Sequence, residues 1–470
     1  MDILLLSLAE IIDEDGNEKD YLVNQEGMPP LGLLYLAQML LDKGNYDVMV
    51  YDQCVSGVKN DELLNYIKQK DPKIVGFSIC LHNYFTSIDL INKIKEWNAN
   101  IKIVVGNYTA TFYSKKLMNS VKNVDFCIRG EGEHSFLELV NAIFKNNSNY
   151  KDIKGLTFRK NGIIKLTPKQ KLIQNLNDLP IPNRELIEFD YKLTRKSTSI
   201  MTSRGCPYNC RFCYFSSIMG KKWRHRSVEN IIEELTMLKN QGYKEIVFGD
   251  SNFNLSKKRT YELCSKIRKE GLDEITFSAD LRVDTIDYKQ LNTLVHTNFK
   301  KILFGIESGN QRILDYYRKG TTIDQVKAAV KAANKAKMEI ILGSFIVGAP
   351  DETLEEVINT INFANRLDLS YVSFQILSTL PISSIYQEIV ENGYHTPRED
   401  DWKKWIYVAD ICSDAIPRKV LSKLINEGFI RFFKNKRRFL KFILRGLNSN
   451  NYMNYIKNMI KEGIHTRLAK

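Results

Sequence analysis

The stretch that decides the fold is RGCPYNCRFCYFS, which runs from Arg204 to Ser216. It places Cys206, Cys210 and Cys213 in a C-x3-C-x2-C pattern, so three of the chain's eight cysteines fall within eight residues. Coincidence is a weak explanation for such close spacing, which indicates one ligand held by one loop. The preceding run STSIMTS reads as a β-strand, so the loop follows the carboxyl end of a strand.

Three thiols on one loop limit what that ligand can be. A closed structural zinc site needs four ligands, and no fourth Cys or His lies nearby at a usual spacing. His225 is twelve residues beyond the last cysteine, in the basic run KKWRHR. Three thiolates suit a [4Fe-4S] cluster with one iron left open. Structural zinc and unliganded thiols are the alternatives.

The composition is that of a folded protein without a membrane span. The chain has 470 residues, 43% of them hydrophobic and 11% aromatic, which allows two or three domains with sizeable cores. It has no run of about 18 uncharged apolar residues. The N-terminal apolar run lacks a basic flank and a cleavage site, so we expect a first β-strand in a cytoplasmic protein.

Residues 1–150 alternate short apolar runs with amphipathic segments. Strands are expected at 2–8, 46–52, 73–79, 101–106 and 124–130, and helices at 31–44, 60–71, 87–97 and 133–144. Continuous apolar strands separated by helices predict an α/β, doubly wound parallel sheet. Ligands of such sheets bind at the carboxyl ends of the strands.

A second strand–helix series follows a linker. Asn161-Gly162 predicts a hairpin, and the proline-containing run NDLPIPNREL reads as a linker, so we assign residues 151–195 to hairpin and linker. Strands are then expected at 197–203, 244–250, 275–281, 300–308, 339–348 and 371–377. Six such units over residues 196–390 suit a partial (β/α)6 barrel, because a complete eightfold barrel needs ~250 residues.

Residues 391–470 are predicted to form a basic helical region. The net charge is +13, and the segment 418–470 carries fourteen Lys or Arg against two acids, which is +12 of that total. The rest of the chain is therefore nearly neutral and does not resemble a nucleic-acid binder. Five phenylalanines interleave with the basic residues, which allows peripheral membrane contact, the alternative being a helix packed on the barrel. They are Phe429, Phe432, Phe433, Phe439 and Phe442.

The cysteine loop, with Phe212 at its aromatic position, resembles the signature of the radical S-adenosylmethionine (SAM) superfamily. MPPLGLLYLAQML, DFCIRGEGEHSFLELV and NDLPIPNREL resemble the flavodoxin-like, cobalamin-binding-type domain and linker that precede many such barrels. The resemblance covers nearly all of residues 1–390 and extends to class B radical SAM methylases and anaerobic Mg-protoporphyrin cyclases. It implies a [4Fe-4S] cluster whose open iron binds SAM, which is cleaved reductively to a 5′-deoxyadenosyl radical.

The same resemblance suggests which residues contact SAM at the first strands of the barrel. Asp250 and Ser251, with Asn252, end the second strand, where family members contact the SAM amino group. A helix N-terminal cap is the alternative role for Asp250. Arg282 follows the third strand and could pair with the SAM carboxylate in a forked geometry, although a surface charge is an equal alternative.

Later strands carry the remaining SAM candidates. Glu307 and Ser308 end the fourth strand, where the family contacts the ribose or the methionine part. Gly343 and Gly348 match the adenine-side strand, where glycine would let the backbone approach the base; a plain strand end is the alternative.

The first domain departs from the cobalamin-binding pattern. The D-x-H-x-x-G motif that supplies a histidine to cobalt is absent, and His82 and His134 lie elsewhere. Relatives commonly bind cobalamin without that histidine, so the resemblance still implies a cobalamin site, with Ser78 and Gly106 at the strand ends. We expect Cys54, Cys80 and Cys127 to be buried apolar residues.

These features favour a cobalamin-dependent radical SAM enzyme that methylates an unactivated carbon of a small molecule or peptide. A radical cyclase or rearrangement enzyme, or a tRNA- or rRNA-modifying enzyme, is the alternative. No added RNA-binding domain is present, so nucleic acid is not an expected partner. The resemblance implies an external electron donor such as flavodoxin or ferredoxin.

Overall fold

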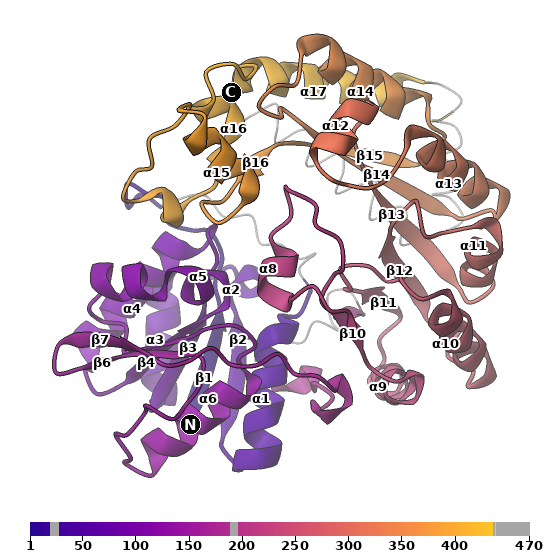
Figure 1. Ribbon diagram of the computed structural model, residues 1–470. Helices are drawn as coiled ribbons and strands as arrows, with labels where there is room; N and C mark the ends of the chain where they lie inside the picture. The colour runs from indigo at the N-terminus through magenta and orange to yellow at the C-terminus, as the bar shows by residue number, and fades with distance from the viewer. Residues whose placement is uncertain (19–27, 189–195, 436–437, 439–470) are drawn as a thin grey trace. The chain divides into compact units, whose positions relative to one another are not determined.

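The protein is described by a computed structural model, which covers residues 1–18, 28–188, 196–435 and 438 (Figure 1). The chain forms two compact units. The first consists of Met1–Ser278 and Thr379–Ile406, and the second of Ala279–Ser378 and Tyr407–Lys470. Among the described residues, no helix combines the length and apolar character that a bilayer crossing requires. The predicted domain boundaries near residues 150, 195 and 390 stay predictions.

A seven-stranded sheet organises the N-terminal part of the first unit, in the order β2-β1-β3-β4-β5-β6-β7. The strands are β1 (Ile3–Ser7), β2 (Val48–Asp52), β3 (Ile74–Ser78), β4 (Lys102–Gly106), β5 (Phe126–Ile128), β6 (Leu156–Lys160) and β7 (Ile163–Leu166). The first five are parallel, which confirms the doubly wound prediction. The predicted hairpin is present as β6 and β7, and β6 pairs antiparallel with β5.

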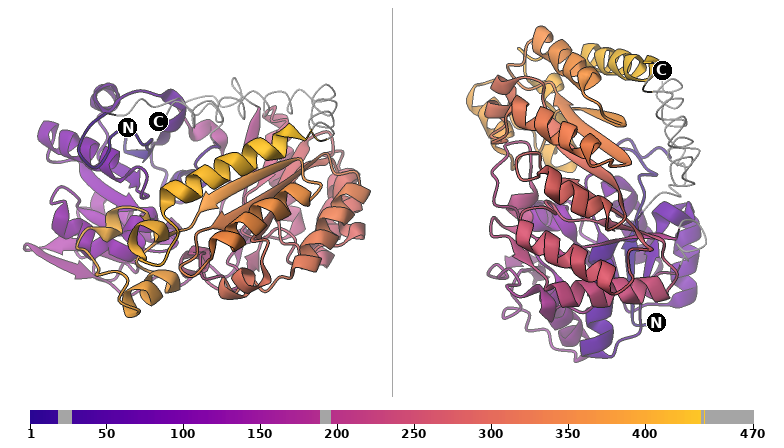
Figure 2. Two further views of the ribbon diagram at one scale, coloured as in Figure 1. Left: turned by 90° about the horizontal axis from the view of Figure 1, so that it is seen from above. Right: turned by 90° about the vertical axis from the view of Figure 1, so that its right-hand side faces the viewer.

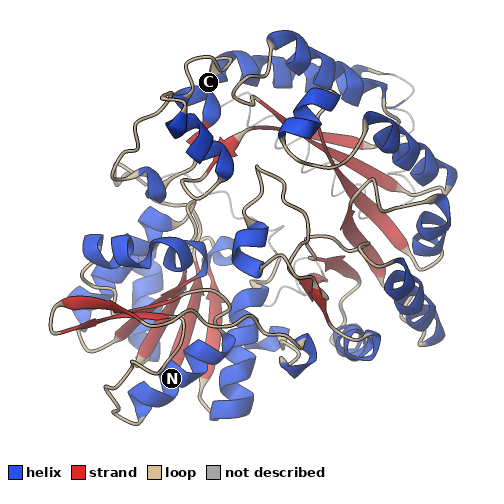
Figure 3. Cartoon of the chain, in the orientation of Figure 1, coloured by secondary structure: helices blue, strands red, loops and turns tan. Residues whose placement is uncertain are grey.

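Helices cover both faces of this sheet (Figure 3). One face packs against α1 (Leu31–Gly44) and α6 (Glu133–Phe144), and the other against α3 (Asn60–Lys70), α4 (Tyr84–Trp97) and α5 (Asn107–Ser120). The short α2 (Gln53–Ser56) follows β2. Leu380 and Trp402 add to the core on the α3–α5 face, so the late segment of the first unit completes this domain.

The first unit then continues into the cysteine-loop region. Its elements are η1 (Leu176–Asp178), η2 (Arg184–Leu186), β8 (Ser197–Ile200), β9 (Ser203–Arg204), α8 (Phe215–Met219), β10 (Arg224–His225), α9 (Val228–Asn240), β11 (Glu245–Phe248) and α10 (Lys257–Lys269). Strand β12 (Thr276–Leu281) spans the division between the units. The late segment holds α15 (Ser384–Glu391) and η3 (Asp401–Lys403), with β16 (Ser378–Thr379) and β17 (Ile406–Tyr407) at its ends.

The second unit is built on β13 (Phe299–Glu307), β14 (Ile340–Val347) and β15 (Tyr371–Ile376), which are parallel neighbours. The full sheet has the order β15-β14-β13-β12-β11-β8, so the six predicted barrel strands are confirmed. Its helices are α11 (Tyr288–Val295), α12 (Gln311–Tyr316), α13 (Ile323–Lys335), α14 (Leu354–Arg366), α16 (Val408–Ile411) and α17 (Arg418–Lys434). Capping boxes at Thr322 and Thr353 fix the starts of α13 and α14.

Helix α17 is the described part of the predicted basic tail, and it lies along α14 and β15 (Figure 2). Phe432 is completely buried, and the rings of Phe429 and Phe433 pack 5.8 Å and 6.0 Å from that of Tyr371. These three phenylalanines therefore contribute to packing within the unit. Phe439 and Phe442, and the rest of the predicted helical tail, lie outside the described residues.

Candidate active site

A pair of two-residue strands closes the base of the cysteine loop. Arg204 of β9 pairs with Arg224 of β10, so residues 205–223 form a loop that begins and ends at one place. Gly205 has a φ of +85°, and a Cβ there would lie 3.0 Å from the carbonyl oxygen of Gly220 and closer still to that of Lys222. Only glycine fits this entry to the loop.

The loop carries three cysteines that are neither fully buried nor fully exposed. Cys206, Cys210 and Cys213 are each partly exposed, and the backbone N–H of Cys213 donates to the carbonyl of Cys210 at 3.1 Å, which forms a tight turn. Phe212, at the family's aromatic position, is half-buried.

The donor set of this loop fits an iron–sulfur cluster. Among the described residues, no three His, Cys, Asp or Glu side chains converge as a single metal ion requires. A [4Fe-4S] cluster does not require three side chains to meet at one metal ion, because each of its thiolates binds a different iron. Three partly exposed cysteines on one loop can therefore hold it and leave one iron open.

Asp250, just beyond the end of β11, is engaged inside the first unit. Its Oδ1 accepts from the backbone N–H of Thr202 at 2.9 Å and the hydroxyl of Ser203 at 2.8 Å, and its Oδ2 accepts from the hydroxyl of Thr202 at 2.7 Å. Burial raises the pKa of this carboxyl. Asp250 thus fixes the strand that leads into the cysteine loop, and its predicted contact with the SAM amino group stays a prediction.

The neighbours of Asp250 differ in their surroundings. Ser251 is exposed, whereas Asn252 is 2% exposed and neither of its side-chain amide atoms has a hydrogen-bond partner among the described residues. A buried amide without a partner is costly, so Asn252 is the group at this strand end with unused hydrogen-bonding capacity.

In the second unit, Lys319 connects two of the SAM candidates. Glu307, at the end of β13, accepts from the Lys319 ammonium at 2.7 Å, and both residues are buried. Arg282 donates to the carbonyl of Lys319 at 2.7 Å and forms a fork with Asp284 at 2.9 and 3.1 Å. Glu307 has a φ of +68°, an unusual conformation for a residue with a side chain, and such conformations cluster at functional sites. Asp284 was not among the residues predicted from the sequence.

Ser308 lies inside the second unit. Its hydroxyl is 3.1 Å from that of Thr360 on α14 and accepts from the backbone N–H of Asn310 at 3.1 Å. It is completely buried. These contacts give Ser308 a packing role, and its predicted contact with the ribose or the methionine part stays a prediction.

Gly343 lies in β14 and Gly348 directly follows it, and packing favours glycine at both positions. A Cβ at Gly343 would meet the side chain of Leu369 at 2.7 Å, and one at Gly348 would meet that of Leu421 at the same distance. The backbone N–H groups of Gly348 and Ala349 donate to Oε2 of Glu352 at 2.6 and 3.1 Å. Burial raises the pKa of Glu352 to about 7. Glu352 was not predicted from the sequence. Its one signal is its position, four residues after Gly348, the glycine that directly follows β14.

The carboxyl edge of the first sheet is open at the predicted cobalamin position. Ser78 and Gly106 are partners in the pairing of β3 with β4. The side-chain N–H groups of Asn107 donate to the Ser78 hydroxyl at 2.9 Å and the Cys80 sulfur at 3.0 Å. A Cβ at Gly106 would find no atom closer than 4.0 Å, so the backbone is not crowded at this strand end.

The histidines and cysteines of the first domain lie as follows. His82 and His134 are both exposed. Cys127 is completely buried, as predicted, whereas Cys54 and Cys80 are only partly buried. The prediction of a buried residue is therefore confirmed for Cys127 alone, and Cys80 lies within hydrogen-bond distance of Asn107.

The cysteine loop touches this edge within the first unit. Tyr214, directly after Cys213, has its ring 5.7 Å from that of Tyr108 on α5. Tyr214 and Ile218 of α8 pack against the core on that face of the sheet. The loop and the edge therefore share one packed surface.

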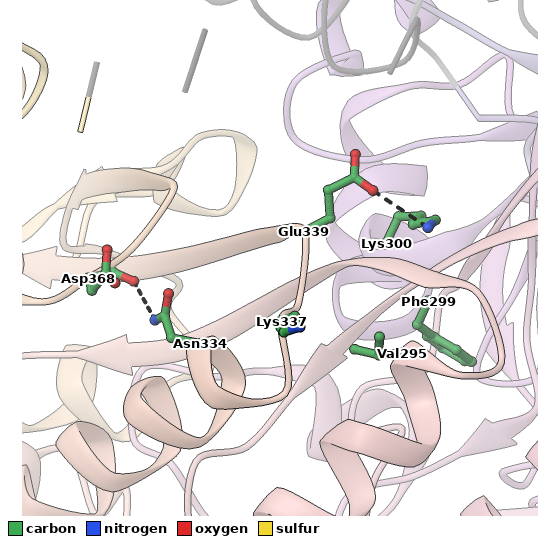
Figure 4. Close-up of a pocket in the computed structure, with 7 residues that line it drawn as sticks. All are labelled: Val295, Phe299, Lys300, Asn334, Lys337, Glu339 and Asp368. Atoms are coloured by element: carbon green, nitrogen blue, oxygen red, sulfur yellow. Dashed lines mark hydrogen bonds and ion pairs between the residues drawn. The ribbon is translucent and has the colours of Figure 1, made fainter. Parts of the chain in front are cut away.

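Figure 4 shows a hollow in the second unit that lies elsewhere. It is lined by Val295, Phe299, Lys300, Asn334, Lys337, Glu339 and Asp368. Phe299 begins β13 and Glu339 precedes β14, so the hollow is at the amino ends of these strands. Glu307 and Gly348 mark the carboxyl ends, so the hollow does not belong to the candidate site.

A parallel sheet carrying a three-thiol loop, joined to a doubly wound domain with an open edge, is typical of radical SAM enzymes with a cobalamin domain. Two family models match: the B12 binding domain over residues 24–140 and the Radical SAM superfamily over residues 200–364. A protein of Pyrococcus horikoshii named an uncharacterized methyltransferase is 36% identical over 419 residues, 88% of this chain and 90% of that protein. The chain belongs to the radical SAM superfamily, in the group with an N-terminal B12 binding domain.

A second relative agrees with this assignment, and a solved structure shares the fold. The anaerobic magnesium-protoporphyrin IX monomethyl ester cyclase of Rubrivivax gelatinosus is 26% identical over 422 residues, 87% of this chain and 74% of that protein. The structure of the radical SAM methyltransferase TsrM from Kitasatospora setae, with tryptophan substrate and a SAM analog bound, superposes with a TM-score of 0.71 at 19% identity. It covers 83% of this chain and 76% of that one, and it supports the fold.

Proposed function

We propose that the protein is a cobalamin-dependent radical SAM methyltransferase that methylates an unactivated carbon of a small molecule. The observation that carries this proposal is the contact of the cysteine loop with the open sheet edge, through Tyr214 and Tyr108, inside one compact unit. A carbon radical is short-lived, so its source and the methyl donor must be held together before it forms. A loop packed on the edge meets that demand.

The chain's own residues have distinct tasks in this proposal. When bound, the cluster and SAM supply a 5′-deoxyadenosyl radical, and cobalamin supplies a methyl group. Cys206, Cys210 and Cys213 hold the cluster, and the edge at Ser78 and Gly106 seats the corrin. The predicted SAM contacts of Phe212, Asp250, Ser251, Arg282, Glu307, Ser308, Gly343 and Gly348 belong to the same proposal.

Two tyrosines of α5 lie beside the contact between the loop and the edge. Tyr108 and Tyr113 of α5 are buried, with ring centroids 5.9 Å apart. Burial raises the pKa of both hydroxyls, that of Tyr113 to about 12. Both hydroxyls therefore stay protonated near neutral pH, and the ring of Tyr108 packs against that of Tyr214.

The products of SAM distinguish methyl transfer from a cyclase or rearrangement reaction. The reduced, cofactor-loaded protein would be incubated with SAM carrying a trideuterated methyl group and a small-molecule extract, and the products followed by mass spectrometry. A methyltransferase gives 5′-deoxyadenosine and S-adenosylhomocysteine in comparable amounts, with label in a small molecule. Formation of 5′-deoxyadenosine alone would support the cyclase reaction, which the Rubrivivax gelatinosus relative makes the second candidate.

The cluster is tested by replacing all three loop cysteines with alanine. Reconstituted wild-type protein should hold about four iron atoms per chain, and the triple variant should lose this iron and all SAM cleavage. Cys264→Ala is the matched control, because Cys264 is buried on α10. Its iron content should equal that of the wild type. A triple variant that still cleaves SAM would contradict the proposal.

The proposal also includes the cytoplasm as the place of action and an external one-electron donor such as flavodoxin or ferredoxin. Thiols that hold an exposed cluster need a reducing compartment. Arg211 lies inside the cysteine loop and forms an ion pair with Glu388 of α15. This pair cancels the positive charge of the Arg211 side chain.

A further inference from the structure

Two carboxylates follow β5 at the carboxyl edge of the first sheet, and both are buried. Glu131 is 6% exposed and Glu133 is 5% exposed. Sequence reasoning would place such residues on the surface, because Glu is almost never fully buried unless it is paired. Their partners are the two arginines that close the base of the cysteine loop.

Arg204 binds both carboxylates. Its guanidinium donates to Oε1 of Glu131 at 3.2 Å and to Oε1 of Glu133 at 2.6 Å. The guanidinium also lies 5.4 Å from the ring centre of Tyr35. Burial alone would lower the pKa of Arg204, but the two carboxylates outweigh it and raise that pKa. Arg204 therefore stays charged and is held from three sides, two residues before Cys206.

Arg224 binds Glu131 from the other strand of the base. Its guanidinium donates to both carboxylate oxygens of Glu131 at 3.0 Å, to the carbonyl of Ile173 at 2.6 Å and to that of Met219 at 2.7 Å. The backbone N–H of Ile173 donates back to Glu131 at 2.7 Å. One carboxylate thus joins both strands of the loop base and the linker.

We propose that Glu131 is a positioning residue that fixes the cysteine loop at a set distance from the cobalamin edge. This inference rests on the proposed function. Apolar packing of the same volume would stabilise the unit equally well, because a buried ion pair repays little more than its desolvation cost. What charge-assisted hydrogen bonds from two arginines add is a fixed orientation. That orientation matters at the root of the loop, since a small displacement there moves every cysteine.

Glu131→Gln keeps the shape of the side chain and removes its charge. Glu234→Gln is the matched control: Glu234 of α9 is equally buried, and its carboxylate pairs with Arg184 at 2.6 Å and with Arg226. Among the described residues, its ion pairs are with Arg184 and Arg226 and not with Arg204 or Arg224. Both variants lose a buried ion pair, but Glu234 acts on Arg226, which follows β10, whereas Glu131 binds an arginine of each strand of the loop base.

The distance between the reduced cluster and cob(II)alamin in the loaded protein would be measured by pulsed electron paramagnetic resonance. Product ratios would be measured in the same samples. We expect a single distance in the wild type and in Glu234→Gln, and a broadened distribution in Glu131→Gln. The ratio of 5′-deoxyadenosine to methylated product should rise by about tenfold or more in Glu131→Gln, since a misplacement of ~1 Å can cost ~100-fold.

The outcomes separate this inference from the proposed function. A wild type that forms no S-adenosylhomocysteine would refute the function. A wild type that methylates, together with a Glu131→Gln variant of unchanged distance and unchanged ratio, would overturn the positioning role alone. If Glu131→Gln does not load its cofactors, Glu133→Gln decides the question. It breaks only one contact to Arg204 and leaves the pairing of Glu131 with Arg224, so it should shift both readouts in the same direction by less.

Discussion

Replacing Gly205 with alanine tests how the entry to the cysteine loop is built. Two costs add at this position. A φ of +85° is unfavourable for any residue with a Cβ, by about 1–2 kcal/mol. The new Cβ would also press on the carbonyl oxygens of Gly220 and Lys222, and such overpacking costs about 1–3 kcal/mol. We therefore expect Gly205→Ala to destabilise the first unit by about 2–5 kcal/mol.

Gly242→Ala separates the two costs. Gly242 has a φ of +88° in the same unit, and an added Cβ there meets nothing within 4 Å. This control should lose only about 1–2 kcal/mol. At about 2 °C per kcal/mol for a unit of this size, calorimetry should give a fall in Tm of about 2–4 °C for Gly242→Ala and about 4–10 °C for Gly205→Ala.

Iron content provides the second readout. The clash at Gly205 pushes against the carbonyl of Gly220, which accepts from the backbone N–H of Cys206 at 3.1 Å. Gly205→Ala should therefore also reduce the iron retained after reconstitution, whereas Gly242→Ala should not. Equal Tm values and equal iron in the two variants would refute the reasoning, because the contact with the loop backbone would then have no effect.

Three further outcomes are expected. His82→Ala and His134→Ala should leave the absorption spectrum of bound cobalamin unchanged, and loss of a cobalt ligand in either spectrum would contradict the predicted absence of a histidine ligand. Gly106→Trp should fill the open edge and reduce cobalamin content while the iron content stays at the wild-type level; unchanged cobalamin would place its site elsewhere. The pKa of Glu352 is raised to about 7, so between pH ~4.3 and 7 the folded state keeps a proton that the unfolded state has lost, and stability falls as pH rises. Glu352→Gln should remove about 4 kcal/mol of this dependence in unfolding measured across that range, and parallel curves for the two proteins would disprove the assignment.

Local patterns were enough to predict both sheets, because each strand is a continuous apolar run between helices. The helix α5 was missed. Its sequence NYTATFYSKKLMNS is weakly apolar, and a non-helical backbone at Tyr113 breaks the period on which prediction depends. The hairpin around Asn161-Gly162 was predicted, but its pairing with β5 was not, since a turn signal does not identify the next strand in a sheet.

The chemistry of the cysteine loop was predictable from spacing, whereas the partners of charged residues were not. Asp250 and Arg282 were expected to face SAM, and the structure pairs them with Thr202, Ser203 and Asp284. Nothing in the local sequence indicates these contacts, because they join segments that are adjacent only after folding. The buried pairing of Glu131 with Arg204, 73 residues apart, was missed for the same reason.

The division of the chain has a consequence for its synthesis. The chain passes between the two units three times, after Ser278, Ser378 and Ile406. Leu380 and Trp402 belong to the core of the first sheet, so that core remains incomplete on the ribosome until more than four hundred residues have been made. Until then the rings of Tyr84 and Tyr113, which pack on Trp402, stay uncovered and prone to association. A fragment ending after the first domain would keep this exposed aromatic face permanently, so the cobalamin domain is better expressed as part of the whole chain.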